Sequence, residues 1–323
     1  MNPRFILTST SHFPTLREKK SIYVDKTQII YRMVMPQAET AYFLSRPRRF
    51  GKSLLVTTLE AYFQGRKELF NGLAMEKLEQ DWTQYPVLRF DMSGTRYTKI
   101  EDLEERINLQ LMRYEEIYGR NPEAGKLSTS RLNDLIRRAK AQTGQNVVIL
   151  IDEYDAPLLD SVVNEKYFNE MRTALRSFYS PLKESGEHLR FVFLTGITKL
   201  SQLSIFSELN NLKIISMDDR YAAICGITEE EIREYLHPEV ESMAEKHGLD
   251  FEAMMLQLKE KYDGYHFSKV GWATCCPRES RLGEKTQATG LATGGLFSLS
   301  TRVFLAPRAT QPCAASTACG SST

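Results

Sequence analysis

Two short stretches of the sequence hold side chains whose types and order suit phosphate chemistry. Residues 46–53 read RPRRFGKS and end like the phosphate-binding loop G-x-x-x-x-G-K-[ST]. About a hundred residues further on, an apolar run ends in Asp152 and Glu153. A lysine can neutralise phosphate charge, a serine and a carboxylate can hold magnesium, and a second acid can polarise water. The two stretches together therefore favour a nucleotide site.

Each of these residues has an expected role. Lys52 would reach the β- and γ-phosphates, Ser53 would ligate Mg²⁺ directly, and Asp152 would hold the same ion through water. Glu153 would polarise the attacking water. Thr195, at the end of a later apolar run, would sense the γ-phosphate and position that water. For Thr195 the alternative is an ordinary turn after a buried strand, and the sequence leaves both open.

The loop itself departs from the usual pattern, because Arg46 occupies the position of the first glycine. Pro47 fixes φ, so the turn is expected to be pre-shaped rather than flexible. Amides near the start of the following helix would form the anion cradle. The sequence leaves three roles open for the arginines. They could add positive charge at the phosphates, pair with acids of a neighbouring subunit, or form a basic turn exposed to solvent. The expected nucleotide-binding residues are Arg46, Pro47, Arg48, Arg49, Phe50, Gly51, Lys52, Ser53 and Leu54.

The elements that must position these residues alternate between strands and helices. Strands are expected at 40–46, 86–94, 146–152, 189–198 and 211–217, and helices at 53–63, 100–118 and 166–179. This alternation predicts an α/β fold with a parallel sheet. The strand at 146–152 is expected beside the strand at 40–46, since that neighbourhood would bring Asp152 within reach of a magnesium ion on Ser53.

The chain is expected to have three parts. Residues 1–217 form the nucleotide-binding core, and 218–268 form a small helical subdomain with a capping box at Thr228 and Glu231. Residues 269–323 contain no Asp, Asn, Ile, Tyr, His or Met. Six Lys/Arg and two Asp/Glu give this tail a net charge of +4. The remaining 36 Lys/Arg and 39 Asp/Glu give residues 1–268 a net charge of −3. The tail is either a disordered linker or a non-native continuation after a frame change or junction.

Composition excludes several classes of protein. Hydrophobic residues make up 42% and charged residues 26%, with a net charge of +1, which gives no general attraction to nucleic acid or membrane. The arginines of the loop leave only a local patch for nucleic acid. No signal peptide or membrane-spanning run is seen, so a cytoplasmic location is expected. Four of the five cysteines lie in the tail, with spacing that does not suit zinc.

Five motifs in order resemble a known family. YVDKT (23–27), RPRRFGKS (46–53), LIDEYDAPL (150–158), FLTGITK (193–199) and YDGYHF (262–267) are similar to the predicted AAA-ATPase-like family of bacterial proteins. The resemblance implies a P-loop NTPase with strand order 5-1-4-3-2, in which an arginine at position 46 is usual. It also implies a nuclease-like domain after the ATPase. The sequence departs from this pattern after residue 268, and the tail lacks the aspartates of such a site.

Three functions follow from these expectations. The first is an ATPase that uses ATP and Mg²⁺ to drive a conformational change. The second is a switch or interaction module that binds ATP without hydrolysing it, and the third is a small-molecule kinase. Glu153 favours hydrolysis. Homo-oligomerisation is plausible for such an ATPase, and Arg220 is the candidate for an arginine finger.

Overall fold

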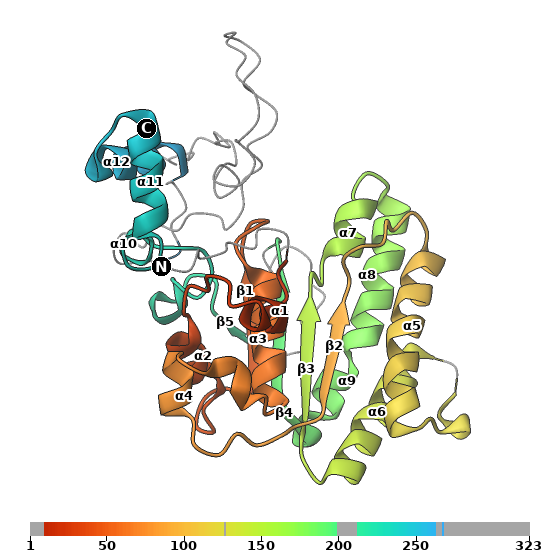
Figure 1. The fold of residues 1–323 in the computed structure, drawn as a ribbon. Coiled ribbons are helices and arrows are strands. Elements are labelled where there is room, and N and C mark those ends of the chain that lie inside the picture. The colour runs from red at the N-terminus through yellow and green to blue at the C-terminus, as the bar shows by residue number, and fades with distance from the viewer. Residues whose placement is uncertain (1–9, 126, 199–211, 263–266, 268–323) are drawn as a thin grey trace, which may run out of the picture.

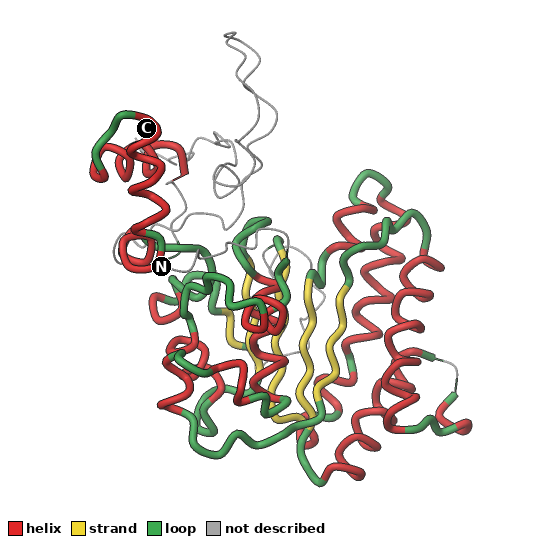
Figure 2. Tube along the Cα trace, viewed as in Figure 1, coloured by secondary structure: helices red, strands yellow, loops and turns green. Residues whose placement is uncertain are grey.

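One parallel sheet forms the centre of the protein (Figures 1 and 2). The computed structural model describes residues 10–125, 127–198, 212–262 and 267. The expected α/β class is confirmed, and each predicted strand overlaps an observed one. The strands are β1 (Ala41–Ser45), β2 (Val87–Asp91), β3 (Val147–Asp152), β4 (Leu189–Gly196) and β5 (Lys213–Ile214).

The order of strands in the sheet is β2-β3-β4-β1-β5, which is 5-1-4-3-2 when read from β5. β4 therefore lies between β1 and β3 and pairs with both. The expectation that the strand at 146–152 lies beside the strand at 40–46 is wrong. Chain order alone does not say where a late strand inserts, and β4 inserts between the two strands that end at the proposed site.

Helices cover both faces of the sheet, as Figure 1 shows. The expected helices at 53–63, 100–118 and 166–179 are confirmed as α3, α5 and α8. One face carries α1 (Phe13–Glu18), α2 (Thr27–Val34), α3 (Lys52–Phe63) and α4 (Ala74–Leu78). The other face carries α5 (Ile100–Tyr118), α6 (Ser128–Thr143), α7 (Ala156–Ser161), α8 (Glu165–Tyr179) and α9 (Pro181–Glu184).

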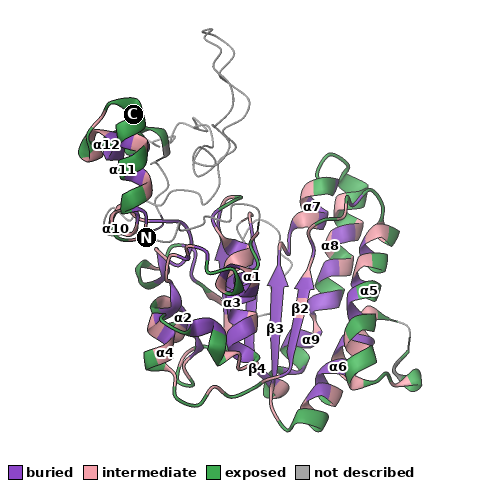
Figure 3. Cartoon of the chain, in the orientation of Figure 1, coloured by how far each residue is buried: buried purple, intermediate pink, exposed green. Residues whose placement is uncertain are grey.

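Strand side chains alternate between these two faces, and the central strand β3 is buried along its whole length (Figure 3). In β3, Val148 and Leu150 pack on the α3 side, whereas Ile149 and Ile151 pack on the α5 side. The same alternation places Asp152 on the α3 side. In β4 it places Thr195 there as well, two residues after Phe193.

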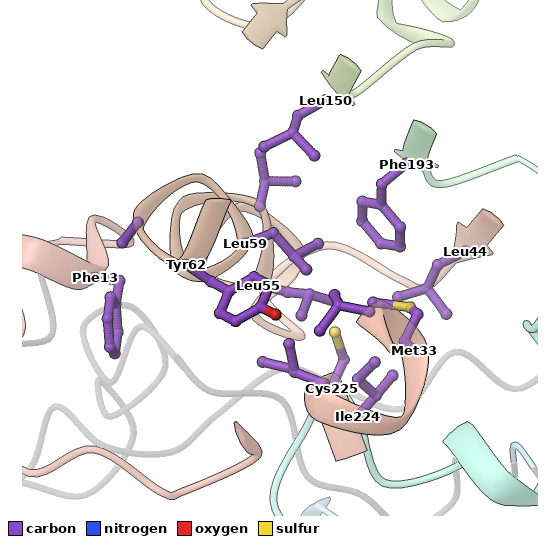
Figure 4. Packing of buried hydrophobic residues seen from close by; sticks show 14 of the residues in the cluster. Phe13, Met33, Leu44, Leu55, Leu59, Tyr62, Leu150, Phe193, Ile224 and Cys225 are labelled. Atoms are coloured by element: carbon purple, nitrogen blue, oxygen red, sulfur yellow. The ribbon is translucent and has the colours of Figure 1, made fainter. Parts of the chain in front are cut away.

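Helix α3 packs against both β3 and β4 because the chain must cross these strands to pass from β1 to β2. Figure 4 shows Leu59 of this helix facing Leu150 and Phe193 of the sheet, in the same cluster as Leu55. This crossing explains how the start of α3 can lie near the end of β3 even though β1 and β3 are not neighbours.

A third group of buried side chains joins the helices α10 (Glu229–Tyr235), α11 (His237–His247) and α12 (Phe251–Tyr262). The predicted capping box is present, since the Thr228 side chain accepts from the Glu231 amide and the Glu231 side chain accepts from the Thr228 amide. Tyr221 and Cys225 pack instead in the cluster around α3. The boundary between residues 217 and 218 stays a prediction, and residues 269–323 lie outside the described part of the chain.

The edge strand β2 has its outer backbone groups covered by side chains of α5. The Tyr114 hydroxyl accepts from the Arg89 amide at 2.7 Å and donates to the Arg89 carbonyl at 3.0 Å. Gln110 accepts from the Asp91 amide at 2.6 Å, and Arg106 donates to the Asp91 carbonyl at 2.9 Å. These contacts satisfy backbone groups that an open sheet edge would expose to other chains.

Removing the Tyr114 hydroxyl should therefore weaken the sheet edge. Tyr114→Phe leaves both backbone groups of Arg89 without this partner, which is expected to lower the free energy of unfolding by about 1–3 kcal/mol. Tyr118→Phe on the same helix is the matched control, because the Tyr118 hydroxyl makes no hydrogen bond within the described part of the chain, where only the Tyr118 carbonyl accepts one. Urea denaturation of the three proteins measures the difference. Equal stability of the two variants would contradict the role of Tyr114.

Candidate active site

The loop between β1 and α3 has the backbone shape of an anion-binding turn. Gly51 caps α3 in the left-handed region with φ 89° and ψ 19°, and Arg49 also has a positive φ of 69°. The first amides of a helix have no partner within that helix. Within the described part of the chain, the N–H groups of Gly51, Lys52 and Ser53 donate to no other group. They form the positive end of the helix, where phosphate groups bind.

Lys52 is the first residue of α3 and is buried in the loop. Lys52 is only 4% exposed, and its Nζ donates a hydrogen bond to the Pro47 carbonyl at 3.2 Å. A buried ammonium is costly without anionic partners. The loop therefore holds a cation at the point where the sequence predicts the phosphates.

Asp152, the last residue of β3, is 3% exposed, and its Oδ1 has no hydrogen-bond partner among the described residues. Its pKa is raised to about 6, mainly by burial, and the charges of Asp91 and Glu153 contribute to the same rise. The Ser53 hydroxyl and the Lys52 ammonium act in the opposite direction. The unpaired carboxylate oxygen of Asp152 and the neighbouring Ser53 hydroxyl are both hard oxygen ligands. These two residues therefore fit Mg²⁺.

Glu153 directly follows β3, and Thr195 is the next-to-last residue of β4. Glu153 is partly exposed and has a φ of 50°, which is unusual for a residue with a side chain. Such strained positions concentrate at functional sites. Thr195 is fully buried, and within the described part of the chain its hydroxyl has no hydrogen-bond partner. The structure thus brings Asp152 and Thr195 to the same face and the same edge of the sheet.

Asp155 was not among the predicted site residues, yet it fixes the segment after β4. Its buried carboxylate accepts from the amides of Ile197 at 3.0 Å and Thr198 at 2.6 Å. Gly196 permits this approach, because a Cβ there would lie 2.4 Å from Asp155 Oδ1 and 2.5 Å from the Tyr154 ring. In the sequence, the available signal was that Asp155 is the third acid of the LIDEYDAPL motif.

Asp91, at the end of β2, is a second residue that sequence reasoning missed. It is paired in register with Asp152 on the neighbouring strand, and its negative charge contributes to the raised pKa of Asp152. Its Oδ1 accepts from the Ser93 amide at 2.8 Å. The available signal was an acid in the second half of the strand expected at 86–94, similar to the acid that ends the run before Glu153.

The arginines of the loop differ in their surroundings. Arg48 and Arg49 are exposed, whereas Arg46 is 1% exposed. The Arg46 guanidinium donates to the Ser216 carbonyl at 2.7 Å. Arg220, the candidate arginine finger, pairs with Asp218 at 2.6 Å. The expected contacts of the arginines with nucleotide and of Arg220 with another subunit stay predictions.

The chain belongs to the family described as Predicted AAA-ATPase, which matches residues 8–206. It is also 39% identical over 258 residues to an uncharacterized protein in the vnfD 5' region of Azotobacter chroococcum mcd 1. That match covers 79% of this chain and 47% of the relative, so the chain spans about half of the relative's length. None of the described helices combines the length and apolar character needed to cross a bilayer.

Because the Asp152 carboxylate is buried, we expect the stability of the folded protein to depend on pH. Its pKa is higher in the folded protein than the ordinary 3.8, so the folded state binds more protons and stability falls as pH rises from about 4 to about 6. At neutral pH the ionised form costs about 3 kcal/mol, at 1.36 kcal/mol per pKa unit. Asp152→Asn should therefore melt at a higher temperature than the metal-free wild type at about pH 7.5, and at a similar temperature near pH 4.

Thermal unfolding without metal at the two pH values measures this difference. Asp81→Asn, a change at an exposed acid, is the control and should follow the wild type at both. A melting temperature of Asp152→Asn below that of the wild type at neutral pH would contradict the unpaired carboxylate.

Proposed function

We propose that this protein binds ATP at residues 46–54 and hydrolyses it with Mg²⁺ to drive a conformational change, in the bacterial cytoplasm. One observation supports this more than any other. A buried lysine and a serine begin α3, and the buried carboxylate of Asp152 lies beside that serine with one oxygen unpaired. Membership in the predicted ATPase family supports the same assignment.

The start of α3 binds the triphosphate in this proposal. The amides of Gly51, Lys52 and Ser53 donate to phosphate oxygens, and the Lys52 ammonium leaves the Pro47 carbonyl for the β- and γ-phosphates. Arg48 and Arg49 are exposed beside them and add positive charge.

Ser53 and Asp152 would hold the magnesium ion, Ser53 directly and Asp152 through water. When bound, the ion neutralises charge that develops on the phosphates during transfer. Asp152 Oδ1, which has no hydrogen-bond partner among the described residues, would contact a water molecule of this ion.

Glu153 acts as the base that orients and deprotonates the attacking water. Its positive φ turns the chain sharply after β3, next to Asp152. Thr195 positions the same water through its hydroxyl, which is buried on the α3 side of β4 and has no partner among the described residues. Asp155 holds the segment after Thr195 in place through the Ile197 and Thr198 amides.

Two substitutions separate binding from hydrolysis. Lys52→Ala removes the cation that faces the β- and γ-phosphates, so ATP affinity and turnover should both fall. Glu153→Gln keeps Asp152 and the shape of the site but removes the base, so binding should survive. Loss of a positioned base slows turnover by roughly 10²–10⁴-fold, or about 2.7–5.5 kcal/mol of barrier. Titration with labelled ATP, followed by phosphate release, measures both effects.

The matched control is Glu187→Gln, because Glu187 is exposed at the opposite end of β4 and should leave both quantities unchanged. The hydrolase proposal fails if the wild type binds ATP and releases no phosphate above the Glu153→Gln background. That result would favour the non-hydrolysing switch. Phosphate transfer from ATP to a small acceptor would favour the kinase.

A further inference from the structure

Arg46 replaces a glycine of the usual loop, and its side chain points into the protein. The residue is 1% exposed, and its guanidinium Nη1 donates to the Ser216 carbonyl at 2.7 Å. Nη2 lies 3.4 Å from the carbonyls of both Tyr221 and Ala222. The guanidinium carbon lies 3.9 Å from the centre of the Phe267 ring. A buried cation is thus surrounded by backbone dipoles and an aromatic face.

The other end of the loop contacts the same part of the chain. The Phe50 carbonyl accepts from the Gly226 amide at 2.9 Å, and the Phe50 ring meets Phe267 edge-on at 5.5 Å. Before the loop, the Ser45 amide donates to the Ser216 hydroxyl at 2.9 Å. The loop is therefore held at both ends. We call the residues that hold it the carboxyl-terminal clamp: Ser216, Tyr221, Ala222, Gly226 and Phe267.

These contacts suit positioning better than phosphate binding. Moving the Arg46 guanidinium to a phosphate would leave three carbonyls without their cation and would remove the stacking on Phe267. Breaking buried polar contacts of this kind is costly. The Arg46 amide also donates to the Gly196 carbonyl at 3.2 Å, directly after Thr195. Arg46 thus joins the loop, the end of β4 and the clamp.

The clamp continues directly into the helices α10–α12. Thr228, two residues after Gly226, is the N-cap of α10, and Glu231 in the first turn of this helix forms a salt bridge with the buried Lys26. Ile22 and Val24, on the same N-terminal segment, pack against the helical cluster. A change in the shape of the loop must therefore be accommodated in the clamp, next to the start of these helices.

We propose that Arg46 is a positioning residue that couples nucleotide binding at the loop to helices α10–α12 through the carboxyl-terminal clamp. The proposal rests on the proposed function, because it presupposes that ATP binds at the loop. Coupling of this kind is reciprocal, so the factor by which the clamp strengthens ATP binding is the factor by which ATP strengthens the clamp. Typical coupling factors are about 5- to 150-fold.

Hydrogen exchange with and without ATP tests the coupling. In the wild type, saturating ATP and Mg²⁺ should slow exchange both in the loop, 46–55, and over α10 with its flanking residues, 227–236. In Arg46→Ala, ATP affinity should fall by about 5- to 150-fold. At saturating ATP the loop of this variant should still be protected, whereas α10 should no longer respond. Arg46→Lys should not restore the response, because an ammonium cannot reproduce the planar fork.

Arg131→Ala is the matched control, since Arg131 is also buried but pairs with Glu115 between α5 and α6. It should lower thermal stability and leave ATP affinity and the α10 response unchanged. If Arg46→Ala does not fold, Phe267→Leu removes the stacked ring and should uncouple α10 in the same way.

The proposal is overturned if α10 responds to ATP in the folded clamp variant as it does in the wild type. It is also overturned if ATP protects the wild-type loop and leaves α10 unchanged. Absence of protection at the loop itself would instead be a failure of the proposed function, and the coupling would fail with it.

Discussion

The structure depends on how three buried charges around the start of α3 are compensated. Arg46, Lys52 and Asp152 are all less than 5% exposed. Backbone carbonyls surround the Arg46 guanidinium, and the Pro47 carbonyl accepts from Lys52. Asp152 keeps one oxygen without a partner among the described residues, and burial raises its pKa. The Asp152 oxygen is therefore the group of this site that lacks a partner among the described residues, and a divalent cation bound with phosphate would supply one.

The sheet order explains how these charges meet although they come from distant parts of the chain. The connection from β1 to β2 passes over β4 and β3, so α3 packs across both strands. Its first turn can thus face the ends of two strands at once. The strand between β1 and β3 supplies Thr195, and Asp155 secures the backbone just beyond it. Inserting β4 separates the two strands of the expected site and adds a polar group between them.

The sequence predicted the elements better than it predicted their contacts. Apolar runs predicted the five strands, and β1, β3 and β4 are mostly buried, as parallel strands covered by helices on both faces must be. Thr228 and Glu231 predicted a capping box, since the two partners are three residues apart. The neighbour of β1 could not be predicted locally, and neither could the partners of Arg46, which lie about 170 residues away. Asp155 was missed for a similar reason, because its amide partners follow a different strand.

The most direct test of the central claim is the position of the metal when nucleotide is bound. Crystals of the chain with a non-hydrolysable ATP analogue and Mn²⁺ in place of Mg²⁺ would show the ion by its anomalous scattering. We predict a single peak at the Ser53 hydroxyl, on the side of Asp152, with the terminal phosphates over the amides of Gly51 to Ser53. A metal and triphosphate bound away from the start of α3 would contradict the account.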